Sequence, residues 1–149
     1  MPAALGTCLK ARERHMTIRG HCLCGRVEYE SSSDPMAFIL CHCRDCQYAS
    51  GGEPTAAVVV RSSSFKITKG EVKGYSSKAE SGSSVTRQFC PECGTPLFAF
   101  GERRPEIMAI KVGSLDDPSG LKPTAFIWTR SAQPWAHRDP SIPSLEEEG

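Results

Sequence analysis

The chain has 149 residues and a formal net charge of +1, which suits a single domain with no strong preference for a charged partner. Its 18 basic and 17 acidic residues are nearly balanced, whereas nucleic-acid binding usually needs a concentrated basic surface. The longest aliphatic stretch, residues 56–60, is far shorter than the roughly 20 residues that span a bilayer, so neither nucleic acid nor membrane is expected as a partner.

The N-terminal residues 1–15 carry a basic run and show no apolar periodicity, which predicts a flexible leader that leaves Cys8 outside the domain. They lack the charged segment followed by a long apolar segment that is typical of a secretory signal. We therefore expect a reducing, cytoplasmic compartment, in which clustered cysteines are metal ligands or redox groups rather than disulfides.

From residue 16 the pattern is one of short β-rich runs separated by turn residues, and it predicts a mainly β domain over residues 16–138. Val27 and Tyr29 alternate with polar neighbours, as in half-buried strands. The expected strands are residues 26–30, 37–40, 55–60, 65–68, 71–75, 85–89, 97–100, 107–112 and 124–128. A helical turn or two is expected at residues 44–49, and residues 139–149, with two prolines and three glutamates, are expected to form a C-terminal tail.

Seven of the eight cysteines fall into three clusters: Cys22 with Cys24, then Cys41, Cys43 and Cys46, then Cys90 with Cys93. Cysteines two apart on an extended strand point to the same side, and cysteines three apart converge across a tight turn. Gly25 and Gly94 follow two of these pairs, and a glycine allows the positive φ that turns backbone N–H groups toward thiolates.

Counting ligands divides the seven cysteines into four and three. Structural zinc is nearly always held by four ligands, whereas catalytic zinc keeps three protein ligands and one open position. The simplest assignment joins the two distant pairs into a closed site and leaves the trio Cys41, Cys43 and Cys46 as an open one. We therefore expect two zinc ions per chain, the second of them labile.

Other uses of these cysteines remain open at this point. A disulfide between cysteines one residue apart is strained, which argues against oxidised pairs. The alternatives are a second structural site, in which His42 or Asp45 completes the trio, and a redox sensor that uses Cys43 and Cys46. His42 lies between two expected ligands, so in an extended segment its side chain points away from them.

Three stretches in this order closely resemble the glutathione-dependent formaldehyde-activating enzyme family, which includes a centromere-protein-V-like branch. They are residues 20–27, residues 41–46 with Ser50 and Gly51, and residues 87–94, and the resemblance extends over about residues 16–138. It implies several coiled antiparallel sheets similar to those of the small zinc-binding Rab exchange factors. It also implies a structural zinc on Cys22, Cys24, Cys90 and Cys93, and a catalytic zinc on Cys41, Cys43 and Cys46.

The resemblance further implies a carbon–sulfur lyase that handles S-(hydroxymethyl)glutathione, with a small thiol such as glutathione as partner. Arg44 and Arg87 are our candidates for binding its carboxylates, because a cation beside a carboxylate makes a charge-assisted hydrogen bond. Phe126 stands where many family members have a histidine, and the chain looks shorter than the formaldehyde-activating members. The alternative function is a non-enzymatic, zinc-stapled interaction module.

Overall fold

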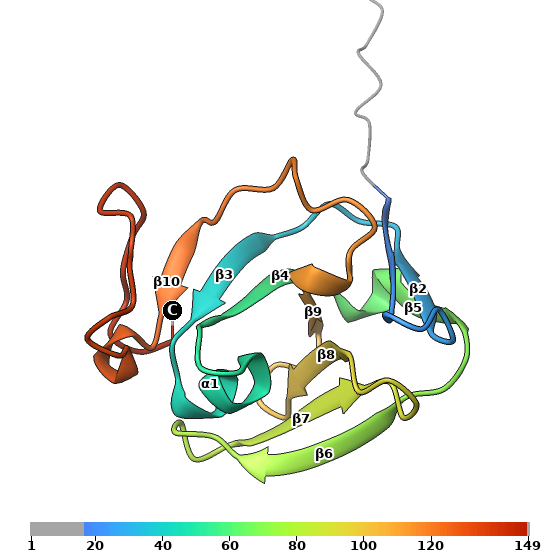
Figure 1. Ribbon diagram of the computed structural model, residues 1–149, viewed down its shortest axis with the longest axis horizontal. Helices are drawn as coiled ribbons and strands as arrows, with labels where there is room; N and C mark the ends of the chain where they lie inside the picture. The colour runs from blue at the N-terminus through green and yellow to red at the C-terminus, as the bar shows by residue number, and fades with distance from the viewer. Residues whose placement is uncertain (1–16, 149) are drawn as a thin grey trace, which may run out of the picture.

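The computed structural model describes residues 17–148, so the whole of the expected leader, residues 1–15 with Cys8, lies outside the described residues (Figure 1). This part of the chain forms ten strands, one α-helix and three short 3-10 helices, which confirms the mainly β prediction. The strands are β1 (Ile18–His21), β2 (Glu28–Ser31), β3 (Ala37–Cys41), β4 (Thr55–Arg61), β5 (Phe65–Lys69), β6 (Lys73–Lys78), β7 (Ser84–Phe89), β8 (Pro96–Gly101), β9 (Ile107–Lys111) and β10 (Ala125–Ile127). The helices are α1 (Arg44–Ser50), η1 (Ser62–Ser64), η2 (Val112–Ser114) and η3 (Thr129–Ser131). No helix within residues 17–148 has the length and apolarity needed to cross a bilayer.

The strands form two sheets. The larger sheet has seven strands in the order β10-β3-β4-β9-β8-β7-β6, and the smaller has three in the order β1-β2-β5. All neighbours pair antiparallel except β10, which runs parallel to β3. In Figure 1 the small sheet lies at the right of the large sheet, and α1 lies below the C-terminal end of β3.

The hydrophobic core fills the space between the two sheets. One face of the large sheet supplies Val58, Ile110 and Phe98, which lie side by side on β4, β9 and β8 and are 0 % exposed. The small sheet supplies Tyr29, whose ring meets that of Phe98 edge-on at 4.8 Å between centroids. Edge-to-face aromatic pairs add to the burial of apolar area, so this contact fixes how the sheets sit against each other.

Gly20 on β1 permits a close approach between the small sheet and the backbone of η2. A Cβ placed there would lie 2.2 Å from the hydroxyl of Tyr29 and 2.3 Å from the backbone oxygen of Ser114. Both atoms are held, because the Tyr29 hydroxyl donates to Ser114 Oγ at 2.6 Å and Ser114 donates to the carbonyl of Lys111 at 2.8 Å.

Gly20→Ala is therefore expected to lower the free energy of unfolding by about 2–3 kcal/mol, the usual cost of overpacking a closed site. Gly113→Ala is the matched control, since a Cβ at Gly113 meets nothing within 4 Å. Urea unfolding followed by circular dichroism measures both. Equal stabilities for the two variants would contradict the close approach at Gly20.

The helix α1 begins directly after the end of β3. The Sγ atom of Cys43 accepts a hydrogen bond from the backbone N–H of Cys46 at 3.4 Å and so serves as the N-cap. Gly51, with a φ of 84°, ends the helix in the left-handed region that glycine adopts at least cost. The short turn of helix expected at residues 44–49 is confirmed, and two of the three clustered cysteines form its N-cap and part of its first turn.

The C-terminal residues lie alongside β10. Phe126 N–H donates to the carbonyl of Pro143 at 2.8 Å, and Leu145 N–H donates to the carbonyl of Phe126 at 2.8 Å. Farther along, Trp128 N–H donates to the carbonyl of Glu147 at 3.2 Å. The segment that the sequence assigned to a tail therefore covers the outer edge of β10, leaving the backbone groups of that edge paired.

Candidate metal centres and the cavity beside the second

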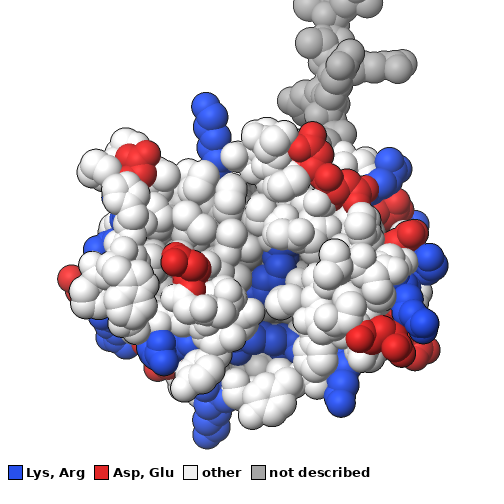
Figure 2. All heavy atoms as spheres, in the orientation of Figure 1, with Lys and Arg blue, Asp and Glu red and all other residues white. Residues whose placement is uncertain are grey.

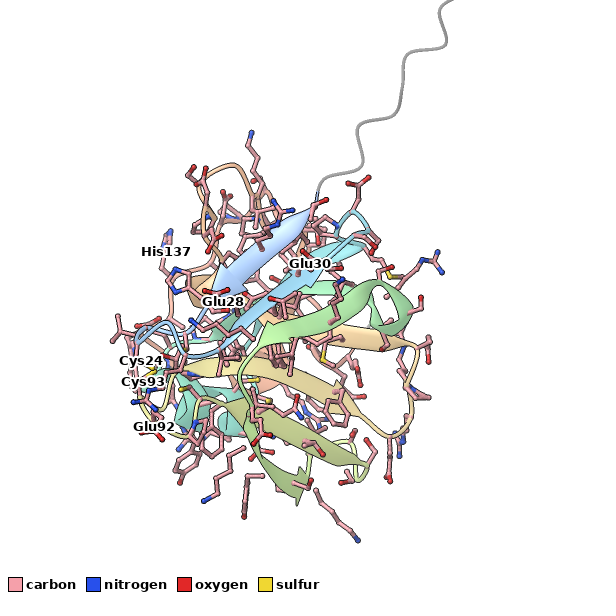
Figure 3. The ribbon with its side chains drawn as sticks, turned by 90° about the vertical axis from the view of Figure 1, so that its right-hand side faces the viewer. Cys24, Glu28, Glu30, Glu92, Cys93 and His137 are labelled. Carbon is pink, nitrogen blue, oxygen red and sulfur yellow. The ribbon has the colours of Figure 1, made fainter. Side chains whose placement is uncertain are left out.

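The first cluster joins two turns that are about seventy residues apart in the chain. Cys22 and Cys24 follow β1, whereas Cys90 and Cys93 lie in the turn between β7 and β8. Figure 3 shows Cys24 and Cys93 next to each other at one edge of the molecule. The N–H of Leu23 donates to Thr95 Oγ1 at 3.0 Å, which fixes one turn against the other.

The geometry of this cluster fits a tetrahedral zinc ion. All four sulfur atoms lie within 4.8 Å of one another, with 3.5 Å between Cys22 and Cys24 and 3.8 Å between Cys24 and Cys90. Four sulfurs placed about 2.3 Å from a tetrahedral zinc ion would be about 3.8 Å apart. All seven cysteines in the described part of the chain are free thiols, so none of them forms the disulfides that the sequence analysis argued against.

Hydrogen bonds already favour thiolates in this cluster. The N–H of Val27 donates to Cys22 Sγ at 3.3 Å, and hydrogen bonds from Thr95 lower the pKa of Cys93 to about 5. Gly25 and Gly94 have φ values of 77° and 75°, which confirms the positive φ predicted after each pair. The pKa values of Cys22 and Cys93 are thus lowered toward the thiolate form that binds metal, whereas the neighbouring thiols raise the pKa of Cys24 to about 11.

The second cluster lies at the junction of β3 and α1. Cys41 ends β3, Cys43 caps α1 and Cys46 lies in its first turn, and the three buried sulfurs lie within 4.8 Å of one another. Neither His42 nor Asp45 belongs to this group of the described residues. His42 is buried with its ring 5.9 Å from that of Phe126, so it packs on the far side of the strand.

The three thiols of the second cluster do not lose their protons equally. Hydrogen bonds from Cys41 and Cys43 hold the pKa of Cys46 well below its ordinary value, while the same contacts raise the pKa of Cys41. The positive charge of Lys111 on β9 also lowers the pKa of Cys46, although burial lowers the pKa of Lys111 itself. Negative charge in this cluster is therefore concentrated on Cys46, facing a buried ammonium group.

Lys111 is a functional candidate that the sequence reasoning missed. Only 8 % of the residue is exposed, and no carboxylate among residues 17–148 forms an ion pair with it. Buried lysines are normally paired, because an isolated buried charge is costly. The signal was a single charged residue in the apolar run 107–112, on the same face of the strand as Ala109.

A cavity of about 370 Å³ opens beside the three cysteines, on the concave face of the large sheet. Lys111, Arg87 and Trp128 line it near the sulfurs, and the exposed Glu80, Arg103 and Arg104 line it elsewhere. Its remaining wall is made mostly of small and aliphatic side chains from β3, β4, β7, β8 and β9. The volume falls within the usual range of small-molecule sites.

The structure separates the two arginines that the sequence singled out. Arg87 lines the cavity, and its Nε is buried without a hydrogen-bond partner in the described part of the chain. Arg44 stacks on the ring of Tyr48 at 5.1 Å from its centroid and is absent from the cavity lining formed by residues 17–148. Trp128 also lines the cavity, with a φ of 53°, whereas Phe126 is buried beside His42.

A second cavity, of about 480 Å³, lies between α1 and the β6–β8 part of the large sheet. Tyr48 and Tyr75 form part of its wall, and Arg87 and Lys111 belong to the walls of both cavities. Figure 2 shows a hollow near the middle of the molecule with basic side chains at its floor. Positive charge is thus concentrated where the two cavities approach the cysteine trio.

The fold and the two clusters define a small, mainly β protein whose cysteines are arranged to bind metal. Residues 17–131 match the family model described as glutathione-dependent formaldehyde-activating enzyme, and the chain belongs to this family. A Halomonas elongata protein named "Putative glutathione-dependent formaldehyde-activating enzyme" is 28 % identical over 111 residues, covering 68 % of this chain and 67 % of its own. A crystal structure of a Rhodobacter sphaeroides protein has a similar fold, with a TM-score of 0.55 at 22 % identity, covering 70 % of this chain and 91 % of its own.

Proposed function

We propose that the chain is a zinc-dependent enzyme that joins a small thiol of the glutathione type to an aldehyde and runs the same reaction in reverse. In this proposal Cys22, Cys24, Cys90 and Cys93 hold a structural zinc, and Cys41, Cys43 and Cys46 hold a catalytic one. The observation that carries the proposal is the position of the trio at the end of a ligand-sized cavity. The family to which the chain belongs gives the reaction type its support.

A zinc ion bound by the trio supplies a Lewis acid with one free position, which favours the thiolate form of a substrate thiol. Three cysteine thiolates and one divalent ion sum to one negative charge, and a fourth thiolate brings the sum to two. Lys111 and Arg87 supply two positive charges beside this group. Since uncompensated charge in a buried site is costly, these two cations favour an anionic fourth group over a neutral one.

The reaction conserves atoms and electrons without an oxidant. The sulfur of the thiolate bonds to the carbonyl carbon, the π electrons of the C=O bond move to the oxygen, and that oxygen takes up the proton that the thiol released. Lys111 and Arg87 hold the thiolate and any nearby carboxylate in place, and the walls of the cavity confine the aldehyde. Positioning of two reactants alone lowers a barrier by about 7–11 kcal/mol at best.

The test combines metal analysis with NMR exchange spectroscopy of glutathione and formaldehyde. We expect about two zinc ions per chain, of which one exchanges and responds to glutathione, together with faster exchange between free and adduct forms. A protein that holds both ions tightly, ignores thiols and leaves the exchange rate unchanged would instead be an interaction module. Reversible oxidation of Cys43 and Cys46 with no metal bound would favour the redox sensor.

The two arginines give a matched pair of variants for the binding of the thiol substrate. Arg87→Met is expected to raise the KM for glutathione by about 10-fold or more, because a hydrogen bond to a charged group is worth about 1.5–3 kcal/mol. Arg44→Met is expected to change the KM by less than about 2-fold, since a surface cation away from the cavity contributes little. The initial rate of adduct formation at varied glutathione concentration measures both, and a larger effect at Arg44 would reverse their proposed roles.

A further inference from the structure

The two faces of the large sheet carry different kinds of side chain on the same three strands. On the core face, Val58, Ile110 and Phe98 lie opposite one another across β4, β9 and β8, and all are 0 % exposed. One residue along, the opposite face carries Val59, Ala109 and Ala99 in the same cross-strand arrangement. These three line the cavity and are only partly buried, although they lie in the middle of a sheet.

The small side chains create the cavity. Ala57 on β4 and Ile107 on β9 lie next to this row, and Ile39 and Val85 border it on the neighbouring strands β3 and β7. Large side chains at the alanine positions would fill the concave face as they fill the core face. Their absence leaves about 370 Å³ of space between the sheet and the loops that cover it. A dry apolar cavity of about 150 Å³ already accommodates benzene.

The chemistry of this wall restricts what can occupy it. Backbone N–H and C=O groups of the central strands are engaged in the sheet ladders, and the side chains of Val59, Ala109 and Ala99 offer no donor or acceptor. The peptide body of glutathione carries two carboxylates and an ammonium group, which would lose hydration against such a wall without compensation. Formaldehyde adds a single carbon and leaves most of the space unused.

We infer that the aldehyde partner of this enzyme carries an apolar alkyl or aryl group, which the alanine-floored face of the large sheet binds. The substrate class is then a hemithioacetal whose carbon bears a chain or ring rather than two hydrogens. This inference rests on the proposed function, because it takes the reacting sulfur to lie at the cysteine trio. The thiol enters beside Lys111 and Arg87, and the apolar group extends along β4, β9 and β8 away from the sulfurs.

The first experiment measures binding without chemistry. Benzyl alcohol, which has the ring but no carbonyl group, is titrated into the zinc-loaded chain carrying ¹³C-labelled methyl groups on alanine, valine and isoleucine. We expect saturable shifts at Ala57, Ala99 and Ala109, with little change at Ala56, whose side chain belongs to the opposite face of β4. Shifts that do not saturate, or that map elsewhere, overturn the inference.

Two leucine variants then test whether the space is required. Ala109→Leu fills the cavity and is expected to weaken benzyl alcohol binding by about 10-fold, since each buried methylene contributes about a factor of 4. Ala56→Leu makes the same exchange on the core-facing side and is expected to leave binding unchanged. If Ala109→Leu does not fold, Ala99→Leu on the neighbouring strand takes its place. Equal binding by the filled variant and the parent overturns the inference.

The second experiment compares aldehydes with glutathione by exchange NMR, each expressed relative to its own rate without protein. We expect the acceleration for butanal and benzaldehyde to exceed that for formaldehyde by about 10-fold or more, and to fall by a similar factor in Ala109→Leu. Acceleration of formaldehyde alone overturns the inference and leaves the proposed function standing. No acceleration of any aldehyde overturns both.

Discussion

Cys90→Ser is expected to abolish the stable folded state or to lower its melting temperature by more than about 15 °C. The sulfur of Cys90 is buried within the core cluster and belongs to the group that joins the turn after β1 to the β7–β8 turn. A structural zinc contributes about 10–16 kcal/mol at neutral pH, and the loss of one ligand in four is expected to forfeit about 5 kcal/mol of it. Domains have only about 5–15 kcal/mol of net stability to lose.

Leu23→Ala is the control for this result, because Leu23 lies between two of the ligands and its side chain is 86 % exposed. Its free energy of unfolding is expected to stay within about 0.5 kcal/mol of the parent value. Thermal unfolding by circular dichroism, with zinc content measured on the same samples, gives both readings. A Cys90→Ser chain that melts with the parent would remove the structural zinc from the proposal.

The grouping of the seven cysteines into a set of four and a set of three could be predicted from the sequence, because metal binding depends on the number and spacing of the ligands. Four plus three follows from the clusters themselves, and the structure places Cys22 and Cys24 beside Cys90 and Cys93 as that count requires. The burial of Val27 and Tyr29 was accessible in the same way, from period-two alternation. Both signals are local in the chain or fixed by chemistry.

The large sheet was less accessible, because strand pairing over long distances leaves no local signal. Nothing in the sequence around Ala125 and Ile127 indicates that β10 runs parallel to β3, or that residues 143–147 lie alongside it. Alternation also fails on β9, where Ala109 and Lys111 face a cavity rather than water or core. A strand that faces a binding cavity lacks the regular alternation of apolar and polar residues, so its sequence does not predict the floor of the site.

The role of Lys111 could not be predicted from the sequence for the same reason, because the groups that it contacts are distant in the chain. The cysteine trio offsets part of the cost of burying its charge, and Lys111 comes near the trio because β4 pairs antiparallel with both β3 and β9. The arginine prediction depended on proximity in the chain to a cysteine motif. That criterion selected Arg87, which lines the cavity, but equally selected Arg44, whose helix turns its side chain toward Tyr48.

Cys46→Ser is expected to remove the second zinc and the catalysis while leaving the fold intact. The residue is buried in the trio, and its backbone N–H, which donates to Cys43 Sγ, is kept in the variant. A hydroxyl group is a much poorer zinc ligand than a thiolate, so zinc content is expected to fall from about two ions to about one per chain. The free energy of unfolding is expected to change by about 1 kcal/mol, in contrast to the variant at Cys90.

Asp45→Asn decides whether the trio is an open site. Asp45 lies next to Cys46 in the chain, but its side chain lines the second cavity and is outside the group of sulfurs found among residues 17–148. If the trio keeps its fourth position for substrate, this variant retains about two zinc ions and the parent rate of glutathione–formaldehyde exchange. Loss of the second zinc in Asp45→Asn would make Asp45 a fourth ligand. The site would then be closed, and a closed structural site has no position at which a substrate thiol can bind.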